Sequence, residues 1–445
     1  MHIHIPEGAR YIIDHLKTAG FDAYAVGGCV RDSILGKAPK DWDICTSAIP
    51  RRVMECFKEH HVIETGLKHG TITIMLGNVP FEVTTYRIDG NYSDNRHPDS
   101  VAFTNTLKED LSRRDFTINA MAYNPAAGVV DFFGGISDLR AGIIKCVGDP
   151  DKRFQEDALR IMRALRFASE LGFSIDGDTS AAMRKNRKLL NNISAERIAG
   201  EIRKLIIGNN AGSLLLKHLS VLTEIIPEMT PAIGFEQNNP NHCYDVLRHI
   251  LLSVDNAPEN IHIRLAMLFH DIAKPACYTE TDGIGHFYVH PQVSSDMAKK
   301  ILLRLKYDND TIETVTQLIL YHDADIQPRR KHIKRWLNKI GEKRFRQLLE
   351  VKRADALAQA PHCRNNKIAG LNEIIIITDD IIKQRQCFSL KDLAVNGRDL
   401  ISIGVPQGVK IGVILNQLID KVIDEQVQND KSTLLEMAGQ LAKQL

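Results

Sequence analysis

The stretch "AVGGCVRDSILGKAPKDWDICTSAIP", residues 25–50, places two adjacent glycines ahead of an Arg-Asp pair, followed by two aspartates that are one residue apart. Glycines after a strand let backbone N–H groups approach phosphate oxygens, and the N-terminus of a following helix adds positive dipole. Asp41 and Asp43 on an extended chain project to the same side, so both carboxylates can bind the same hard cations. Taken alone, the two glycines are equally well explained as an ordinary strand-to-helix turn, and the two aspartates as solvated acids of a loop. Whether they form one site depends on the rest of the chain.

The composition describes a soluble globular protein, with 44% hydrophobic and 25% charged residues. A length of 445 residues exceeds one ordinary core, so about two to four domains are expected. No stretch reaches the roughly 18 apolar residues of a membrane span, and the N-terminus lacks a signal-peptide pattern. The eight cysteines lack CxxC spacing, which favours a reducing cytoplasm. A net charge of +2 neither demands nor excludes nucleic acid, which would have to meet local basic patches such as residues 184–188 and 329–335.

Helix and strand patterns alternate over the first 150 residues and then give way to helices. A helix is predicted over 7–18, strands over 22–26, 70–76 and 80–87, and a polar loop between Arg87 and Val101. Residues 156–173 carry apolar side chains at helical spacing, and helices continue to about 225. Residues 230–243 are a plausible linker, 242–358 are helical and rich in histidine, and 364–445 are mainly helical around a glycine-bearing turn.

This pattern predicts an α+β fold, in which a small mixed α/β head with an antiparallel-containing sheet precedes an all-helical body and tail. The predicted domains are a head over 1–149, a helical neck over 150–228, a histidine-rich domain over 240–360 and a tail over 364–445.

The head offers further acids and cations for the same site. Two acids rarely suffice for two Mg²⁺ ions, and Glu82 in "PFEVTTYR" is the obvious third carboxylate, unless it is an exposed strand acid. Any one arginine here could form a surface salt bridge, but four in one small domain favour binding of a triphosphate: Arg31, Arg87, Arg113 and Arg114.

Six motifs in order carry a family resemblance: "GGCVRD", "DWD", "RRDFTINA", "DFFGGISDL", "EDALRIMRALRF" and "SAERIAGEI". Together they resemble the class II tRNA nucleotidyltransferases, which are the bacterial CCA-adding enzymes and their poly(A) polymerase relatives. The match is dense over residues 20–210 and looser to the C-terminus. The resemblance implies that CCA is added to tRNA 3′ ends from CTP and ATP by two-metal phosphoryl transfer without a nucleic-acid template. Catalysis would fall to Asp41, Asp43 and Glu82 with Mg²⁺.

The resemblance assigns base recognition to Asp157 and Arg160, three residues apart in a predicted helix. There the carboxylate can accept a hydrogen bond from the exocyclic amine of C or A, while the guanidinium donates to the adjacent ring nitrogen. Uracil and guanine reverse both polarities, so they would be rejected. An ordinary helix ion pair is the alternative. The nucleotide-binding set implied by the family is completed by Gly28, Arg31, Arg114, Arg163 and Arg166, although Arg163 or Arg166 could be a solvated arginine.

The long loop 87–99 fits the complete CCA-adding type, because CC-adding relatives have a shortened loop there. An A-adding enzyme would keep the same loop, so that alternative stays open.

The histidine-rich domain resembles the HD phosphohydrolase superfamily. Imidazoles and carboxylates are ligands for Mn²⁺, Ni²⁺, Fe or Mg²⁺, and an adjacent His-Asp pair can bridge two ions. "HDIAKP" has Ala273 where glycine is usual. The resemblance implies a second divalent-metal site at His249, His270, Asp271, His290, His322 and Asp355.

The tail segment 393–424 resembles the part of these enzymes that holds the tRNA elbow, although a helical pair closed by a glycine turn would look the same. The sequence as a whole therefore predicts a cytoplasmic CCA-adding tRNA nucleotidyltransferase without membrane contact. The alternatives are an A-adding or poly(A) polymerase relative, a metal-dependent phosphohydrolase and a non-catalytic RNA-binding protein. The oligomeric state stays open.

Overall fold

The computed structural model describes residues 2–64, 66–90 and 100–444, and it divides into two compact units, Met1–Pro227 and Glu228–Leu445. The boundary lies next to the predicted linker. The finer division into four domains stays a prediction.

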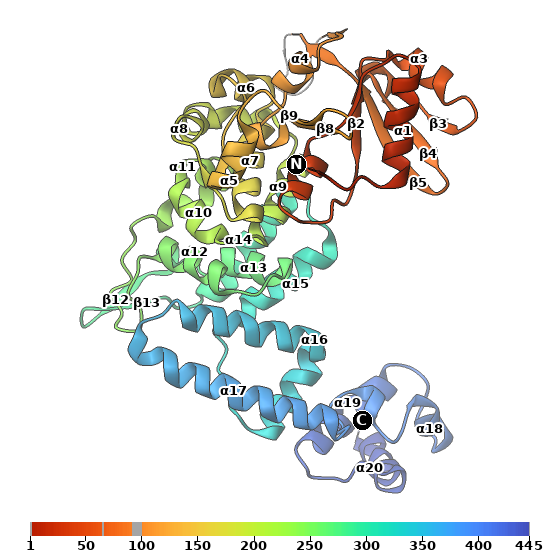
Figure 1. Ribbon diagram of the computed structural model, residues 1–445. Helices are drawn as coiled ribbons and strands as arrows, with labels where there is room; N and C mark the ends of the chain where they lie inside the picture. The colour runs from red at the N-terminus through yellow and green to blue at the C-terminus, as the bar shows by residue number, and fades with distance from the viewer. Residues whose placement is uncertain (1, 65, 91–99, 445) are drawn as a thin grey trace. The chain divides into compact units, whose positions relative to one another are not determined.

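The first unit is built on a mixed sheet (Figure 1). Among the described residues it has seven strands in the order β3-β4-β5-β2-β1-β8-β9. β2 and β5 are parallel, with Asp43 opposite Glu82, and the other neighbours are antiparallel. The strands are β1 (Ala23–Val26), β2 (Asp43–Thr46), β3 (His61–Ile63), β4 (Thr71–Leu76), β5 (Val79–Thr85), β8 (Met121–Asn124) and β9 (Gly128–Asp131). The predicted antiparallel-containing sheet is confirmed.

Helices of the head pack on this sheet by their apolar faces. α1 (Glu7–Thr18) buries Ala9, Ile12, Ile13 and Leu16, which recur at the 3–4-residue spacing of one helix face. It packs against β1, β2 and α3 (Pro50–Cys56). The remaining head helices are α2 (Gly28–Ile34), α4 (Leu107–Ser112) and α5 (Gly135–Ala141).

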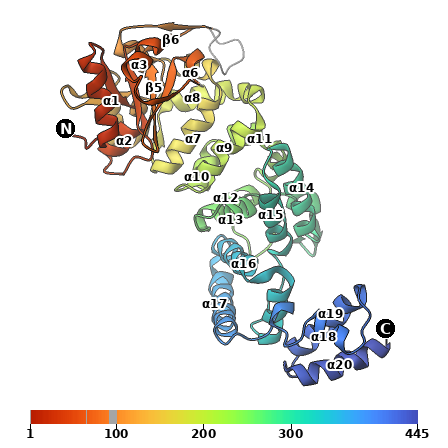
Figure 2. The same cartoon turned by 90° about the vertical axis from the view of Figure 1, so that its right-hand side faces the viewer.

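The neck is a group of helices beside the sheet (Figures 1 and 2). It consists of α6 (Pro150–Glu156), α7 (Leu159–Leu171), α8 (Gly177–Asn186), α9 (Ala195–Ile206), α10 (Ala211–Lys217) and α11 (Leu219–Ile225). A two-strand pairing of β10 (Ile143–Ile144) with β11 (Ser174–Ile175) joins the end of the head to the segment after α7. The prediction of a single helix over 156–173 is therefore wrong, because the helix is interrupted at Asp157, between α6 and α7.

The second unit is mainly helical. Its larger part contains α12 (Val246–Asn256), α13 (Ile261–Phe269), α14 (His290–Arg304), α15 (Asn309–Tyr321), α16 (Arg330–Leu357) and α17 (Pro361–Lys383). Side chains of Asp245, Asn260 and Asp308 cap the N-termini of α12, α13 and α15 by accepting hydrogen bonds from backbone N–H groups. α16 is interrupted at Gly341, where φ is +76°, and its C-terminal half lies beside α17 (Figures 1 and 2).

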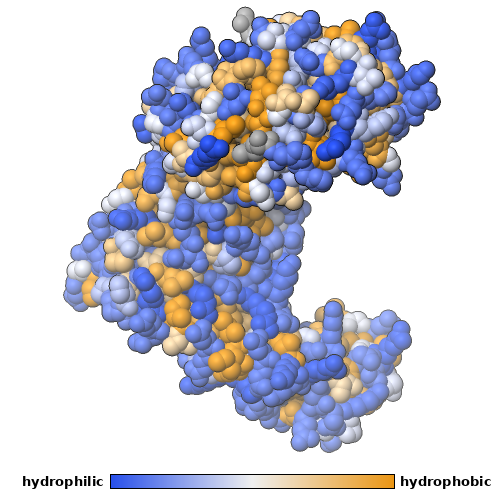
Figure 3. Space-filling model, in the orientation of Figure 1, coloured by the Kyte–Doolittle hydropathy of each residue, from blue (hydrophilic) through white to orange (hydrophobic). Residues whose placement is uncertain are grey.

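The last part of the second unit has its own apolar core. α18 (Gly397–Ser402), α19 (Val409–Ile423) and α20 (Lys431–Gln444) enclose Leu400, Ile414, Leu418 and Leu434. On the face drawn in Figure 3, hydrophilic residues cover most of the surface, with apolar patches between them. Within the described part of the chain, no helix combines the length and apolar character needed to cross a membrane.

Two predicted boundaries need correction. The loop predicted between Arg87 and Val101 begins and ends in strands, because β6 (Arg87–Asp89) pairs with β7 (Val101–Phe103). Residues 91–99 of that loop lie outside the described residues. The body is also not all-helical, since β12 (Thr279–Thr281) and β13 (Ile284–His286) form a hairpin around Asp282 and Gly283. Asp282 and Gly283 both adopt positive φ, which suits such a turn.

Candidate functional site

The two glycines of the opening stretch form the turn between β1 and α2, as predicted. Gly27 has φ +82°, a conformation that favours glycine, and its N–H donates to Met121 O at 3.1 Å. A Cβ at Gly27 would lie 3.1 Å from Nη1 of Arg114, so the backbone and this guanidinium approach each other closely. Gly28 is the first residue of α2.

The predicted acids of the head gather at one edge of β2. Asp43 begins β2, and Glu82 lies opposite it on β5, so both side chains project from the same face of the sheet. Asp41 precedes Asp43 by two residues, and all three residues are exposed. Partial burial by neighbouring protein atoms raises the pKa of the Asp43 carboxyl. The negative charges of Glu82 and Asp41 raise it further, and together these effects outweigh the positive charge of Arg114, which lowers it. A divalent cation would relieve this repulsion, so the donor set fits a metal.

These three acids are not drawn tightly together. In the described residues, the groups of three potential ligands within 4.8 Å are both in the second unit. The head acids stand farther apart, as expected for like charges with no partner between them.

The four head arginines divide into two pairs. Arg114 and Arg31 lie at the glycine turn, since Cβ atoms built on Gly27 and Gly28 would have these two guanidinium groups as their nearest contacts. Arg113 instead pairs with Asp110 at 2.8 Å and with Asp89 at 3.6 Å.

Arg87 also pairs with Asp89, at 3.1 Å. Arg31 pairs with Asp32 at 2.8 Å and Arg114 with Asp110 at 3.4 Å. All four arginines therefore form the salt bridges that the sequence left open, and Arg31 and Arg114 differ from the other two by their place beside the glycine turn.

Asp157 is not on the helix that carries Arg160, contrary to the geometry expected. It has an extended backbone, with φ −136° and ψ 102°, and ends α6. Its Oδ1 accepts from Leu159 N at 3.1 Å, and its Oδ2 accepts from Nη2 of Arg197 at 3.3 Å. Arg160 N donates to Asp157 O at 3.0 Å, so the two residues stay adjacent at the start of α7 without the i,i+3 helix relation.

Each predicted arginine of α7 has an acidic partner. Arg160 donates to Glu156 at 2.7 Å and to the backbone oxygen of Arg113 at 2.9 Å. Arg163 and Arg166 extend the row by pairing with acids outside α7, Asp115 at 2.5 Å and Glu201 at 2.6 Å.

Sequence reasoning did not single out Glu156 or Asp115 as partners of this row. Both stand inside motifs quoted for the resemblance, and an acid four residues before an arginine was the available signal for Glu156.

The second unit brings all six predicted ligands of the histidine-rich domain together. His249 lies on α12, His270 and Asp271 follow α13, and His290 begins α14. Of the other two predicted ligands, His322 follows α15 and Asp355 lies on α16.

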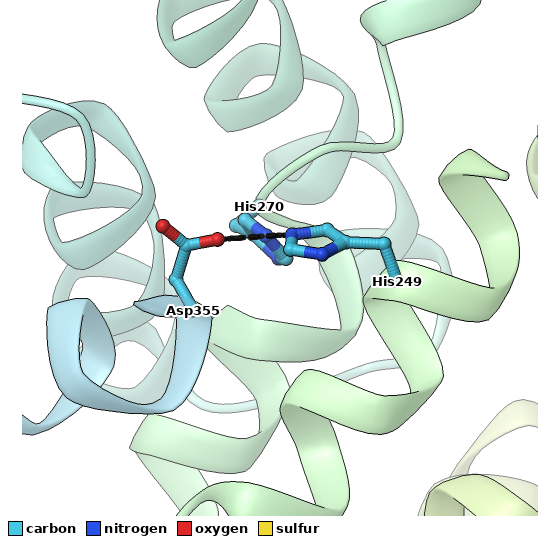
Figure 4. A group of neighbouring side chains, drawn as sticks. All are labelled: His249, His270 and Asp355. Atoms are coloured by element: carbon cyan, nitrogen blue, oxygen red, sulfur yellow. Dashed lines mark hydrogen bonds and ion pairs between the residues drawn. The ribbon is translucent and has the colours of Figure 1, made fainter. Parts of the chain in front are cut away.

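Two compact groups result, one of His249, His270 and Asp355 and one of Asp271, His290 and His322. Figure 4 shows the first group, with both imidazoles turned toward the carboxylate. Nε2 of His249 lies 2.9 Å from Oδ1 of Asp355.

Asp271 lies between the two groups and faces each with a different oxygen. Its Oδ2 is 3.4 Å from Nε2 of His249 and 3.3 Å from Nε2 of His270. Its Oδ1 is 3.2 Å from Nε2 of His290 and 3.5 Å from Nε2 of His322. This is the arrangement that a carboxylate bridging two ions requires.

The four imidazoles share one orientation. Each places Nδ1 against a backbone carbonyl: His249 on Ala358 at 3.3 Å, His270 on Met267 at 2.8 Å, His290 on Phe287 at 2.7 Å and His322 on Ile319 at 2.6 Å. A carbonyl only accepts, so Nδ1 carries the hydrogen and Nε2 is left to bind a ligand. Such outer bonds are what metal-ligating histidines ordinarily have, and the residues present therefore fit a metal.

The charges of this cluster compensate one another. Burial alone would lower the pKa of His270, but the nearby Asp271 and Asp355 outweigh it and raise that pKa. Burial alone would raise the pKa of Asp355, and hydrogen bonds from His249 and His270 instead hold it well below its ordinary value.

A cavity of about 490 Å³ opens onto both groups. Its lining adds Lys274, whose Nζ is 2.7 Å from Oδ2 of Asp271, and His242, whose ring lies 5.2 Å from that of His249. Neither was predicted. Lys274 stands in the quoted "HDIAKP", three residues after Asp271, where a helical turn would bring it back to the acid.

Models of three protein families match the chain. The Poly A polymerase head domain matches residues 23–145, the RNA and SrmB-binding site of polymerase A matches 172–233, and tRNA nucleotidyltransferase domain 2 matches 277–438. The first covers the sheet and both glycines, and the last covers part of the histidine cluster and most of the tail.

Relatives and solved structures match along nearly the whole chain. The CCA-adding enzyme of Limosilactobacillus fermentum is 34% identical over 444 residues, covering 98% of this chain and 97% of that protein. The crystal structure of the Bacillus stearothermophilus CCA-adding enzyme in complex with CTP is 30% identical, covers 98% of this chain and 97% of that chain, and has a TM-score of 0.72. The Thermotoga maritima CCA-adding enzyme complexed with tRNA-CCA is 20% identical and shares the fold, with a TM-score of 0.62. On this similarity, the chain belongs to the CCA-adding enzyme family.

Proposed function

We propose that this chain adds CCA to the 3′ ends of tRNA, taking C from CTP and A from ATP. The observation that carries the proposal is the register of β2 and β5, which sets Asp43 beside Glu82 next to the glycine turn in a chain of this family. We place the reaction in the cytoplasm, because all eight cysteines are free thiols.

The predicted site residues of the head then divide between binding the metal and binding the triphosphate. Asp41, Asp43 and Glu82 would hold Mg²⁺, which supplies positive charge for the attacking hydroxyl and the leaving pyrophosphate. Backbone at Gly28 and the guanidinium groups of Arg31 and Arg114 would bind the triphosphate.

Base selection belongs to the start of α7 in this proposal. Asp157 would accept from the amino group of C or A, and Arg160 would donate to the neighbouring ring nitrogen. Glu156 and the backbone oxygen of Arg113 already fix the guanidinium of Arg160, so little side-chain freedom is lost when a base binds. Arg163 and Arg166 would complete the set of nucleotide-binding residues.

The test uses purified protein, Mg²⁺ and two tRNA transcripts, one ending at the discriminator base and one ending in CC. We expect CTP and then ATP to extend the first, and ATP alone to extend the second. Extension of the second transcript only would identify an A-adding enzyme, and long A tracts would identify a poly(A) polymerase.

The histidine cluster supports a second activity, a metal-dependent phosphohydrolase of the HD type. The favouring observation is the shared orientation of the four imidazoles around Asp271. The six ligands would hold Mn²⁺, Ni²⁺ or Fe, which supplies an activated water, while Lys274 places a positive charge at the mouth of the cluster. Release of phosphate, or opening of a 2′,3′-cyclic phosphate, in each metal after chelator treatment tests this activity.

A further inference from the structure

The ring of Phe167 lies against three of the arginines assigned to the nucleotide. The guanidinium carbons of Arg166, Arg31 and Arg163 are 3.9, 5.0 and 5.3 Å from the ring centroid. Phe167 itself is buried, and Phe116 meets its ring edge-to-face at 5.8 Å. An aromatic face attracts cations at these distances.

Three like charges around one ring would repel one another without compensation, and each has its own anchor. Asp115 binds Nε and Nη2 of Arg163 at 2.8 and 2.5 Å. On α9, Glu201 accepts from Nε of Arg166 at 2.6 Å.

The charge of Arg31 is compensated by Asp32, whose Oδ1 accepts from Nε of Arg31 at 2.8 Å. A second contact of Arg31 leads back to the anchor of Arg163. Nη1 of Arg31 donates to Oδ1 of Asn119 at 2.7 Å, and Nδ2 of Asn119 donates to Oδ1 of Asp115 at 3.1 Å. Burial would raise the pKa of Asp115, but Arg163 and the bond from Asn119 outweigh it and lower that pKa to about 2. The carboxylate of Asp115 is therefore ionised at neutral pH, and it joins Arg163 directly and Arg31 through Asn119.

These contacts join two parts of the nucleotide site. Arg31 belongs to α2 beside the glycine turn, whereas Arg163 belongs to α7 one turn after Arg160. We infer that Phe167 is a positioning residue that holds Arg31 and Arg163 in one fixed relation, so that triphosphate and base are bound as a single unit. This inference rests on the proposed function, and Phe167 acts through the two arginines without touching substrate.

The first experiment measures the Kd of CTP for the full chain in Mg²⁺ by calorimetry. Phe167→Leu keeps most of the apolar volume and removes the aromatic face, and we expect the Kd to rise about tenfold, the scale of one desolvated cation–π contact. Phe57→Leu is the matched control, because Phe57 is equally buried in the same unit but has ring contacts with Tyr11, His15 and His60. Its Kd should stay within about twofold of the parent.

The second experiment measures the coupling itself, which a merely structural role of Phe167 would not change. Arg31→Lys and Arg163→Lys are made singly and together, in the parent and in Phe167→Leu. In the parent background, the fold-rise in Kd of the double variant should be smaller, by about threefold or more, than the product of the fold-rises of the two single variants. In Phe167→Leu the rises should multiply.

Equal coupling in both backgrounds, or a Phe167→Leu Kd within about twofold of the parent, would overturn the inference. If Phe167→Leu does not fold, Phe167→Met replaces it, because methionine also fills the apolar space without an aromatic face, and the same loss of coupling is expected. Nucleotide addition by the parent separates the two proposals. Coupling without addition contradicts the proposed function alone, addition with unchanged coupling contradicts this inference alone, and absence of CTP binding contradicts both.

Discussion

The two acid clusters of this protein solve the same electrostatic problem in opposite ways. In the head, Asp41, Asp43 and Glu82 are exposed and stand apart at one edge of β2, and the pKa of Asp43 is raised. In the second unit, Asp271 and Asp355 are interleaved with histidines, and the pKa values of both acids are lowered well below their ordinary value.

This difference has consequences for what each site can do. An open cluster of like charges gains its counter-charge only when a cation arrives, so it suits metals that enter with a triphosphate and leave with pyrophosphate. A buried cluster whose imidazoles are already oriented suits ions that stay bound, because the free-energy cost of orienting the ligand side chains is met when the protein folds. The predictions below test this contrast.

The largest effect should follow removal of the open acids. Asp41→Ala or Asp43→Ala should reduce addition of both C and A to less than about a tenth of the parent rate, because both additions need the same metals. Binding of tRNA should remain, since it depends mainly on phosphate contacts elsewhere. Single-nucleotide incorporation and a filter-binding assay measure the two. Glu55→Gln, an exposed acid on α3, is the control, and a higher residual rate would show that these aspartates are not ligands.

Loss of the histidine cluster in the second unit, called the closed cluster below, should leave nucleotide addition unaffected. His270→Ala with Asp271→Ala should lower retained Mn²⁺ or Ni²⁺ at least about tenfold after dialysis, as loss of ligands does, and should abolish any phosphohydrolase activity. CCA addition should stay near the parent rate. Metal analysis and the incorporation assay check both, with His332→Ala as control. Collapse of addition in a folded double variant would refute the independence of the two sites.

Stability should reveal the pairing within the closed cluster. In metal-free protein, Asp355→Asn should lower the free energy of unfolding by about 3 kcal/mol, because it leaves buried histidines without their acid. The pKa of Asp355 is lowered in the folded state, so its contribution is present above its ordinary pKa and is lost as the pH falls below it. Denaturant unfolding at several pH values measures this against the exposed Asp379→Asn. A variant as stable as the parent at neutral pH would argue against the pairing.

Base selection is a finer test within the open site. Arg160→Ala should slow the use of CTP and ATP and admit UTP or GTP, with a loss of about 1–3 kcal/mol of discrimination. Asp157→Ala should relax selectivity in the same direction. The assay offers each nucleotide separately to tRNA lacking CCA, with exposed Arg140→Ala as control. If both variants keep full preference for C and A, selection lies with the RNA end, and the start of α7 is only structural support.

The smallest effect is a gain in stability at the open site. Asp43→Asn should raise the Tm of the metal-free protein by about 1–2 °C, because it removes a charge that partial burial and the neighbouring acids disfavour by roughly 0.5 kcal/mol after screening by solvent. The pKa of Asp43 is raised in the folded state, so its ionised form destabilises the fold above that pKa, and the difference should vanish as the pH falls and the carboxyl protonates. Calorimetric scans in EDTA measure this. A lower Tm for the variant would mean that Asp43 is already paired.

Sequence reasoning predicted the residues of both candidate sites, because residue type and local spacing are written directly in the chain. Gly27, Asp43 and the His270-Asp271 pair are recognisable without tertiary information, since each depends on backbone freedom or ligand chemistry at one place. It failed at Asp157, where the apolar pattern continues through a break that the hydrogen bonds from Leu159 and Arg197 stabilise. It also missed the β12–β13 hairpin, whose strands are only three residues long and lack an alternating apolar pattern.

By itself, then, the sequence determined the mixed head and helical body and predicted the exposed head acids and the six candidate ligands of the second unit, because periodicity and side-chain chemistry are local properties. Only the tertiary structure decided which residues meet. The parallel register that puts Glu82 beside Asp43, the contacts of His249 with Ala358 and Asp355, and the ion pair of Arg113 with Asp89 all join distant segments. The physical reason is that such contacts depend on how complementary surfaces pack across the fold, and no short window of the chain contains both partners.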